Sequence, residues 1–218
     1  LTKPSRLETK AAEFADTLSE VLNSTLTVGV RLKAVTVDGK VAFVANGITQ
    51  RNYDRDQGFK LARERGRCQL HMSVFYALDA EPESSYLRVN TSLVKVATDI
   101  EMSRELLHFD YERDKGDGYP EAHMQVCAAS DDWDTALNGT GKGVSKLHFP
   151  VGGRRFRPAL EDVIEFLIVE NLVRPHGGAE AWRRKLDKRR DEFRRIQLAA
   201  AIREDAEFAR KVLAHLKP

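Results

Sequence analysis

Apolar side chains mostly alternate with polar ones from Thr25 to about Val151, and turn signals recur at strand-length intervals. Neighbouring side chains of a strand point to opposite faces, so this pattern predicts antiparallel strands with one buried face. Asp38-Gly39 tolerates positive φ angles and favours a tight hairpin between its flanking runs. The expected strands, about seven in all, lie in TVGVRLKAVTV, KVAFVA, CQLHMSVFYAL, SSYLRVNTSLVKVAT, ELLHFDYE, EAHMQVCA and KLHFPV.

Helical spacing of apolar residues flanks this region on both sides. It predicts a helix from Pro4 to Asn23 and an apolar helix, PALEDVIEFLIVENLV, over 158–173. A further helical stretch runs from Ala179 to Leu216, with a break near Arg203–Asp205. We therefore expect an α+β fold: one helix, a mostly antiparallel sheet and two or three C-terminal helices. Residues 1–175 form the predicted domain, and 176–218 form a basic helical extension.

Two polar stretches interrupt the pattern. ITQRNYDRDQGFKLARERGR, between the first two strand pairs, is interpreted as a loop with a short helix. SDDWDTALNGTGKG, before the last strand, has the composition of an exposed loop.

Composition excludes several classes of protein. The chain of 218 residues is 42% hydrophobic and 31% charged, which is typical of a soluble globular protein. Its apolar runs fall far short of the ~20 residues that span a bilayer, and its first thirty residues resemble no secretory signal. Only Cys68 and Cys127 are present, so we expect a cytoplasmic protein without a disulfide framework. The chain begins with Leu1 rather than Met, which is compatible with a segment of a longer protein.

Four of the six histidines fall on the polar phase of four strands. Leu107 and Phe109 alternate with His108 and Asp110, and the same alternation holds around His71, His123 and His148. If the apolar sets all face one core, the histidines share the opposite face. Same-face residues on adjacent strands have Cβ atoms roughly 4.5–5.5 Å apart, so two or three imidazoles can converge if their strands are neighbours.

Three interpretations of this pattern stay open at the level of sequence. In the first, His108, Asp110, His123 and His148 form a metal-free catalytic centre, with His108 and His123 as general acid and base and Asp110 orienting one ring. In the second, the same imidazoles and carboxylate bind a divalent metal such as zinc. In the third, these are solvated polar residues on a wet strand face.

Basic residues supply candidate ligands for phosphate. Arg154, Arg155 and Arg157 of GGRRFRP precede an expected helix N-terminus, and arginine forks beside such a terminus favour phosphate. From Arg183 to Arg195, eight basic residues stand against three acidic ones. Arg183, Arg184, Lys188, Arg190 and Arg194 are therefore candidates for nucleic-acid binding, although a solvated helix surface or a helix that binds a protein partner explains the run as well.

HFDYERD, YPEAHMQV and LHFPVGGRRFRPALEDVIEFLI, in this order, resemble a loosely defined group of uncharacterised bacterial proteins. Relatives of that group include the toxin partners of some toxin–antitoxin pairs. The resemblance covers about residues 105–170 and implies that His108, Asp110, Pro120, His123, Arg155 and the helix after Pro158 are positions of interest. The long first helix and the basic tail depart from the toxin-like members.

Two hypotheses of function follow. The first is a bacterial effector or toxin-like enzyme that acts on RNA or another phosphoester by histidine acid–base chemistry, as a metal-independent nuclease or phosphoesterase. The second is a non-catalytic protein of a bacterial defence, toxin–antitoxin or mobile-element system, whose C-terminal helices bind a protein partner.

Overall fold

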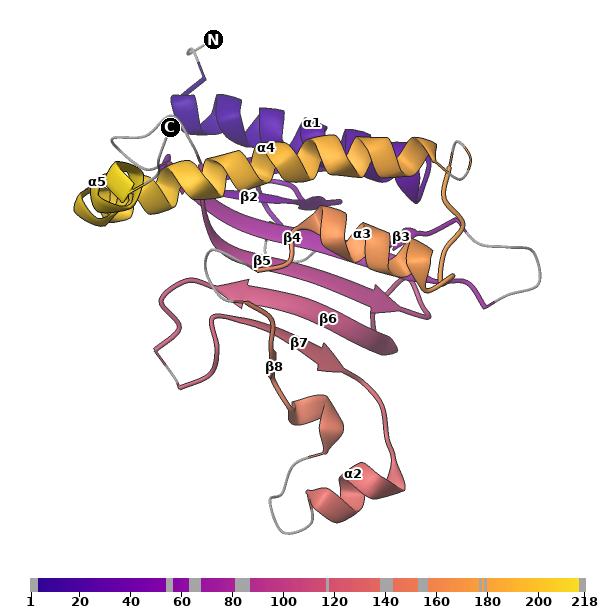
Figure 1. Cartoon of the computed structure of the whole chain (residues 1–218). Helices are drawn as coiled ribbons and strands as arrows, with labels where there is room; N and C mark the ends of the chain where they lie inside the picture. Colours follow the sequence, from indigo (N-terminus) through magenta and orange to yellow (C-terminus); the bar gives the residue numbers. More distant parts are fainter. Residues whose placement is uncertain are drawn as a thin grey trace.

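The chain folds into an antiparallel sheet with helices before and after it, as a computed structural model shows (Figure 1). The structure describes residues 4–53, 57–62, 68–80, 87–116, 118–137, 143–152, 157–176, 178 and 180–215. The elements are α1 (Arg6–Thr25), β1 (Leu32–Val37), β2 (Val41–Asn46), β3 (Phe59–Lys60), β4 (His71–Ala80), β5 (Leu87–Ala97), β6 (Glu105–Glu112), β7 (Ala122–Val126), α2 (Asp131–Ala136), the 3-10 turn η1 (Val144–Lys146), β8 (Phe149–Pro150), α3 (Leu160–Val169), α4 (Ala181–Glu204) and α5 (Ala206–His215). The predicted α+β class is confirmed.

The sheet follows the chain order almost without interruption. Its strands run β1-β2-β4-β5-β6-β7-β8, and the short β3 pairs with the first two residues of β4. The Asp38-Gly39 turn has φ angles of 51° and 65°, as the predicted tight hairpin requires. Apart from β3, neighbours in the sheet are therefore successive strands of the chain, and the three expected strand pairs are all formed.

Local signals fix the first helix. The Ser5 Oγ accepts a hydrogen bond from the Glu8 backbone N–H, and the Glu8 carboxylate accepts one from the Ser5 N–H, which is a capping box. At the other end, the Ser19 hydroxyl accepts a hydrogen bond of 2.9 Å from the Leu32 N–H. This bond attaches α1 to the start of β1.

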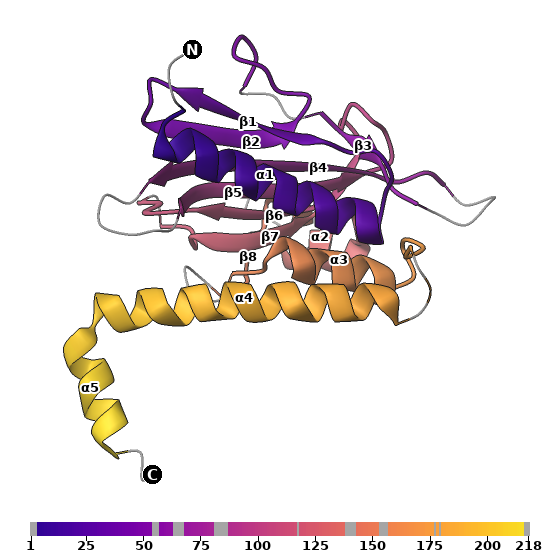
Figure 2. The same ribbon diagram turned by 90° about the horizontal axis from the view of Figure 1, so that it is seen from above.

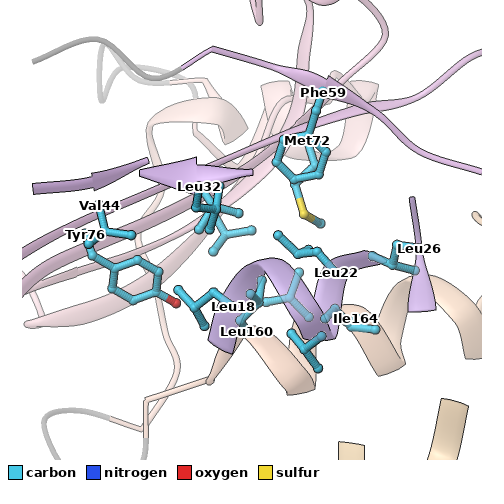
Figure 3. Close-up of a cluster of buried hydrophobic side chains, with 14 of the residues drawn as sticks. Leu18, Leu22, Leu26, Leu32, Val44, Phe59, Met72, Tyr76, Leu160 and Ile164 are labelled. Atoms are coloured by element: carbon cyan, nitrogen blue, oxygen red, sulfur yellow. The ribbon is translucent and has the colours of Figure 1, made fainter. Parts of the chain in front are cut away.

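The main core lies between the sheet and the helices (Figure 3). Helix α1 contributes Leu18 and Leu22, and α3 contributes Leu160 and Ile164; these meet Met72 and the other apolar residues of one sheet face. Helix α4 packs outside α1 and α3 (Figure 2), and inserts Trp182 and Leu186 into the same core. The first turns of the predicted C-terminal extension thus pack on the body of the protein.

Some local expectations differ from the structure. Helix α2 lies in the stretch expected to be a loop, and β3 lies where a loop with a short helix was expected. In that stretch, residues 48–53 and 57–62 are not helical, and 54–56 and 63–67 lie outside the described residues. The last strand is shorter than KLHFPV because η1 occupies its beginning. The expected break near Arg203–Asp205 is present between α4 and α5.

No helix among the described residues combines the length and the apolar character needed to cross a membrane.

Candidate functional site

Three neighbouring strands bring the predicted histidines together. In the β6–β7 ladder, Asp110 pairs with His123 and His108 pairs with Gln125, and in the β7–β8 ladder His123 pairs with Pro150. His148 directly precedes β8 and lies two residues before Pro150, so the side chains of both point to the same side of the sheet. His108, His123 and His148 therefore share one side of the sheet, called here the histidine face. Leu107 and Phe109 lie on the other side, against the main core.

The imidazole rings are close to one another. The ring centroids of His123 and His148 are 4.5 Å apart, and those of His108 and His123 are 6.2 Å apart. Tyr119, from the loop before β7, lies over His148 with ring centroids 4.2 Å apart. The expected convergence is thus observed for three of the four strand histidines. His71 shares the polar phase but lies on β4, two strands away from β6.

His123 is the buried centre of this cluster, with 2% of its surface exposed. Its Nε2 lies 3.7 Å from Asp110 Oδ2, and its Nδ1 lies 3.4 Å from the carbonyl oxygen of Pro120. A carbonyl oxygen only accepts hydrogen bonds, so Nδ1 is the nitrogen that donates there. Burial lowers the pKa of His123, although the charge of Asp110 opposes this effect. The imidazole of His123 is therefore neutral at physiological pH.

Glu105 adds a carboxylate that the alternation did not predict. Its Oε1 contacts His108 Nδ1, which leaves Nε2 as the other polar atom of that ring. A bulge in the β5–β6 ladder makes this contact: Val96 pairs with Leu107, but Ala97 pairs with Glu105. The extra residue, Leu106, turns Glu105 onto the histidine face. The adjacent leucines of ELLHFDYE break the alternation and are the sequence signal for this bulge.

Cys127 lies beside the same carboxylate. Its Sγ donates to Glu105 Oε1 over 3.7 Å. Burial raises the pKa of the Cys127 thiol, and the negative charge of Glu105 raises it further. The thiol therefore stays protonated and lacks the thiolate character of a nucleophile.

The predicted phosphate ligands do not join the histidines in the described structure. Arg154 and Arg155 lie outside the described residues. Arg157 is buried, with its guanidinium 4.4 Å from the Tyr111 ring centroid and 5.5 Å from that of Phe193. Tyr111 alternates with Asp110 on β6, so Arg157 lies on the helix side of the sheet. There it stacks between β6 and α4.

The basic residues of α4 also lie on the helix side, away from the histidine face (Figures 1 and 2). Arg190 is an internal ion-pair residue: it contacts Asp162 at 2.9 Å, Glu165, and Asp187 at 3.7 Å. Burial alone would lower the pKa of Arg190, but the pairs with Glu165 and Asp162 raise it. Arg183 lies over the Trp182 ring, with its Cζ 4.9 Å from the ring centroid. Arg184, Lys188 and Arg194 are exposed.

Metal binding finds no support in the part of the chain that the structure describes. There, no group of three or more His, Cys, Asp or Glu side chains could hold a metal ion. Comparison with family models, curated proteins and solved structures returned no match. The chemistry of the cluster therefore has to be argued from its own geometry.

Proposed function

We propose that the chain is an enzyme or enzyme-like effector that acts on RNA or another phosphoester, with the histidine face as its metal-independent acid–base site. The observation that carries the proposal is the convergence of three imidazoles from β6, β7 and the residue before β8, with a carboxylate beside two of them. Imidazoles change charge near neutral pH and so both accept and donate protons there.

The geometry distributes the roles differently from the sequence prediction. His123 was expected to form the acid–base pair with His108, but it is too buried to touch a substrate. His108 and His148 are half-buried instead, and they flank His123 on neighbouring strands. We therefore assign His108 and His148 to proton transfer. His123 and Asp110 are positioning residues between them.

In this mechanism, His108 removes the proton from an attacking hydroxyl while Glu105 fixes the ring through Nδ1. For RNA, the 2′ oxygen forms the new bond to phosphorus, and the bond from phosphorus to the 5′ oxygen breaks. His148 then donates its proton to the leaving 5′ oxygen, so charge and protons balance. Lys95 pairs with His108 across the β5–β6 ladder and adds a positive charge on the same face.

The test is cleavage of a fluorogenic RNA oligonucleotide in the presence of a chelator. We expect His108→Ala and His148→Ala to lower the rate by about 10²-fold or more, because general acids and bases contribute that much. His71→Ala is the matched control, since it changes a histidine of the same phase outside the cluster. Absence of cleavage by the wild-type chain contradicts RNA as the substrate, and equal rates for all variants contradict the roles of His108 and His148.

A second function, partner binding without catalysis, is favoured by a different observation. Helix α5 buries none of its residues, and its apolar side chains face outwards. Under this proposal the chain serves a bacterial defence, toxin–antitoxin or mobile-element system through its C-terminal helices. Substitutions of the exposed apolar residues of α5 would then abolish binding of the protein partner, and substitutions of His108 and His148 would leave this binding unchanged.

A further inference from the structure

The side of the sheet that carries the histidines also carries apolar residues. A sheet with one wet face normally places polar side chains on that face, yet Phe75 of β4 and Leu93 of β5 lie there and are half-buried. Leu93 pairs with Phe75 on one side and with Asp110 on the other. Asp110 in turn pairs with His123. A short apolar row therefore leads across the sheet to the histidine cluster.

Aromatic rings extend this row away from the histidines. The ring centroids of Phe75 and Phe43 are 5.8 Å apart, and Phe43 stacks on Tyr53 with centroids 5.0 Å apart. Because β4 lies nearer to β6 than β2 does, Phe75 is the ring of this stack nearest to the histidines. A flat group placed over Leu93 would continue the stack.

Tyr119 lies on the opposite side of the cluster. Its surface is 40% exposed, although its ring centroid is 4.2 Å from that of His148. The next residue, Pro120, contacts His123 through its carbonyl oxygen. Tyr119 thus presents an exposed aromatic ring directly beside the imidazole that donates a proton in the proposed reaction. The cluster lies between two surfaces on which a flat group can pack.

The separation of these two surfaces suits a single nucleic-acid strand. Adjacent strands of a sheet are roughly 5 Å apart, so Leu93 on β5 lies roughly 15 Å from the β8 side, where Tyr119 contacts His148. Neighbouring bases of a duplex stack roughly 3.4 Å apart and cannot lie on both surfaces. Unpaired bases can point apart, and they stack on aromatic side chains.

Charge alone attracts phosphate weakly here. Lys95 lies beside His108 on this face, but the carboxylates of Glu105 and Asp110 lie there too and offset its positive charge. Stacking of bases is therefore expected to supply much of the affinity.

We propose that the substrate is single-stranded RNA that crosses the histidine face, with the base after the cleaved bond stacked on Tyr119 and the base before it packed over Leu93 and Phe75. The proposal rests on the proposed function, because the roles of His108 and His148 set the direction of the strand. His148 protonates the 5′ oxygen of the nucleotide after the bond, so that nucleotide lies nearest to Tyr119. Every base has a flat face, so this binding is tolerant of sequence.

Binding of a labelled oligodeoxyadenylate to the full chain tests the stacking, since this probe lacks the attacking hydroxyl and stays intact. Fluorescence anisotropy should show tighter binding of the single strand than of its duplex with oligodeoxythymidylate. Tyr119→Leu should weaken binding of the single strand about fivefold or more, as loss of one base stack does, whereas Tyr119→Phe keeps the ring and should not. Equal affinities for single strand and duplex, or no effect of Tyr119→Leu, overturn the proposal.

Cleavage of the same oligomer with one ribonucleotide inserted tests the direction of the strand, because attack is then confined to one bond. An abasic nucleotide directly after the ribonucleotide should lower kcat/KM of the wild type about fivefold or more and have little further effect on Tyr119→Leu. Removal of the base of the ribonucleotide itself should affect both proteins equally. Cleavage that does not depend on the base after the bond overturns the proposal and leaves the proposed function intact. If the single strand binds through Tyr119 but is not cleaved, the proposed function fails and the binding surface stands.

Discussion

Leu186→Ala measures how α4 is anchored to the rest of the molecule. Leu186 is fully buried in the main core, among residues of α1, α3 and the sheet. Truncation of such a side chain removes its transfer free energy and leaves a cavity, which together cost about 2–5 kcal/mol. We expect about 3 kcal/mol here, or a decrease of roughly 6–12 °C in Tm for a chain of this size. Chemical and thermal unfolding of the purified variant give both values.

Leu198→Ala is the matched control, since it makes the same substitution on the same helix. Leu198 is 53% exposed, so its truncation should change the free energy of unfolding by less than about 0.5 kcal/mol. Equal losses in the two variants would show that the second half of α4 is also packed. A negligible loss for Leu186→Ala would refute the docking of α4 on the body.

Three further predictions concern ionisable groups. Burial lowers the pKa of His123, so the unfolded chain binds a proton at this residue more readily than the folded chain does. The contribution of His123 to the free energy of unfolding should therefore be complete above pH ~6.5 and decrease as the pH falls below it. Urea unfolding at several pH values should show this decrease in the wild type and not in His123→Gln. Burial raises the pKa of Glu161, so Glu161→Gln should increase Tm at neutral pH, and this gain should disappear in acid, where the native carboxyl is protonated. Arg190→Met loses the pairs with Asp162 and Glu165; because Arg190 is 26% exposed, we expect a loss of roughly 1 kcal/mol that shrinks in about 1 M NaCl.

The strand pairs and the histidine face could be predicted because both depend on a local property, the alternation of side chains along a strand. Asp38-Gly39 defined one turn, and alternation placed Leu107 and Phe109 opposite His108. The pairing of β6 with β7 also follows from a short connection, whereas residues 127–148, which include α2, separate β7 from β8, so alternation alone did not predict that β8 lies beside β7.

The remaining features depend on contacts between distant residues. The bulge at Leu106 is set by the pairing of β5 with β6, and alternation read without the paired strand puts Glu105 on the apolar side. Arg157 was expected to bind phosphate because it precedes an expected helix N-terminus, where arginine forks favour phosphate. Its guanidinium is buried instead, because the rings of Tyr111 and Phe193 come to either side of it. Arg190 likewise contacts Asp162 and Glu165 only because α4 packs against α3.

The alternation along β6 has a consequence for how the protein can change. Asp110 and Tyr111 are neighbours in the chain, yet one belongs to the imidazole cluster and the other supports a buried arginine beneath α4. The two faces of β6 thus belong to two different environments, the imidazole cluster on one side and the core beneath α4 on the other. Substitutions at the half-buried His108 should therefore disturb the core less than substitutions at the buried Tyr111, three residues further along the same strand.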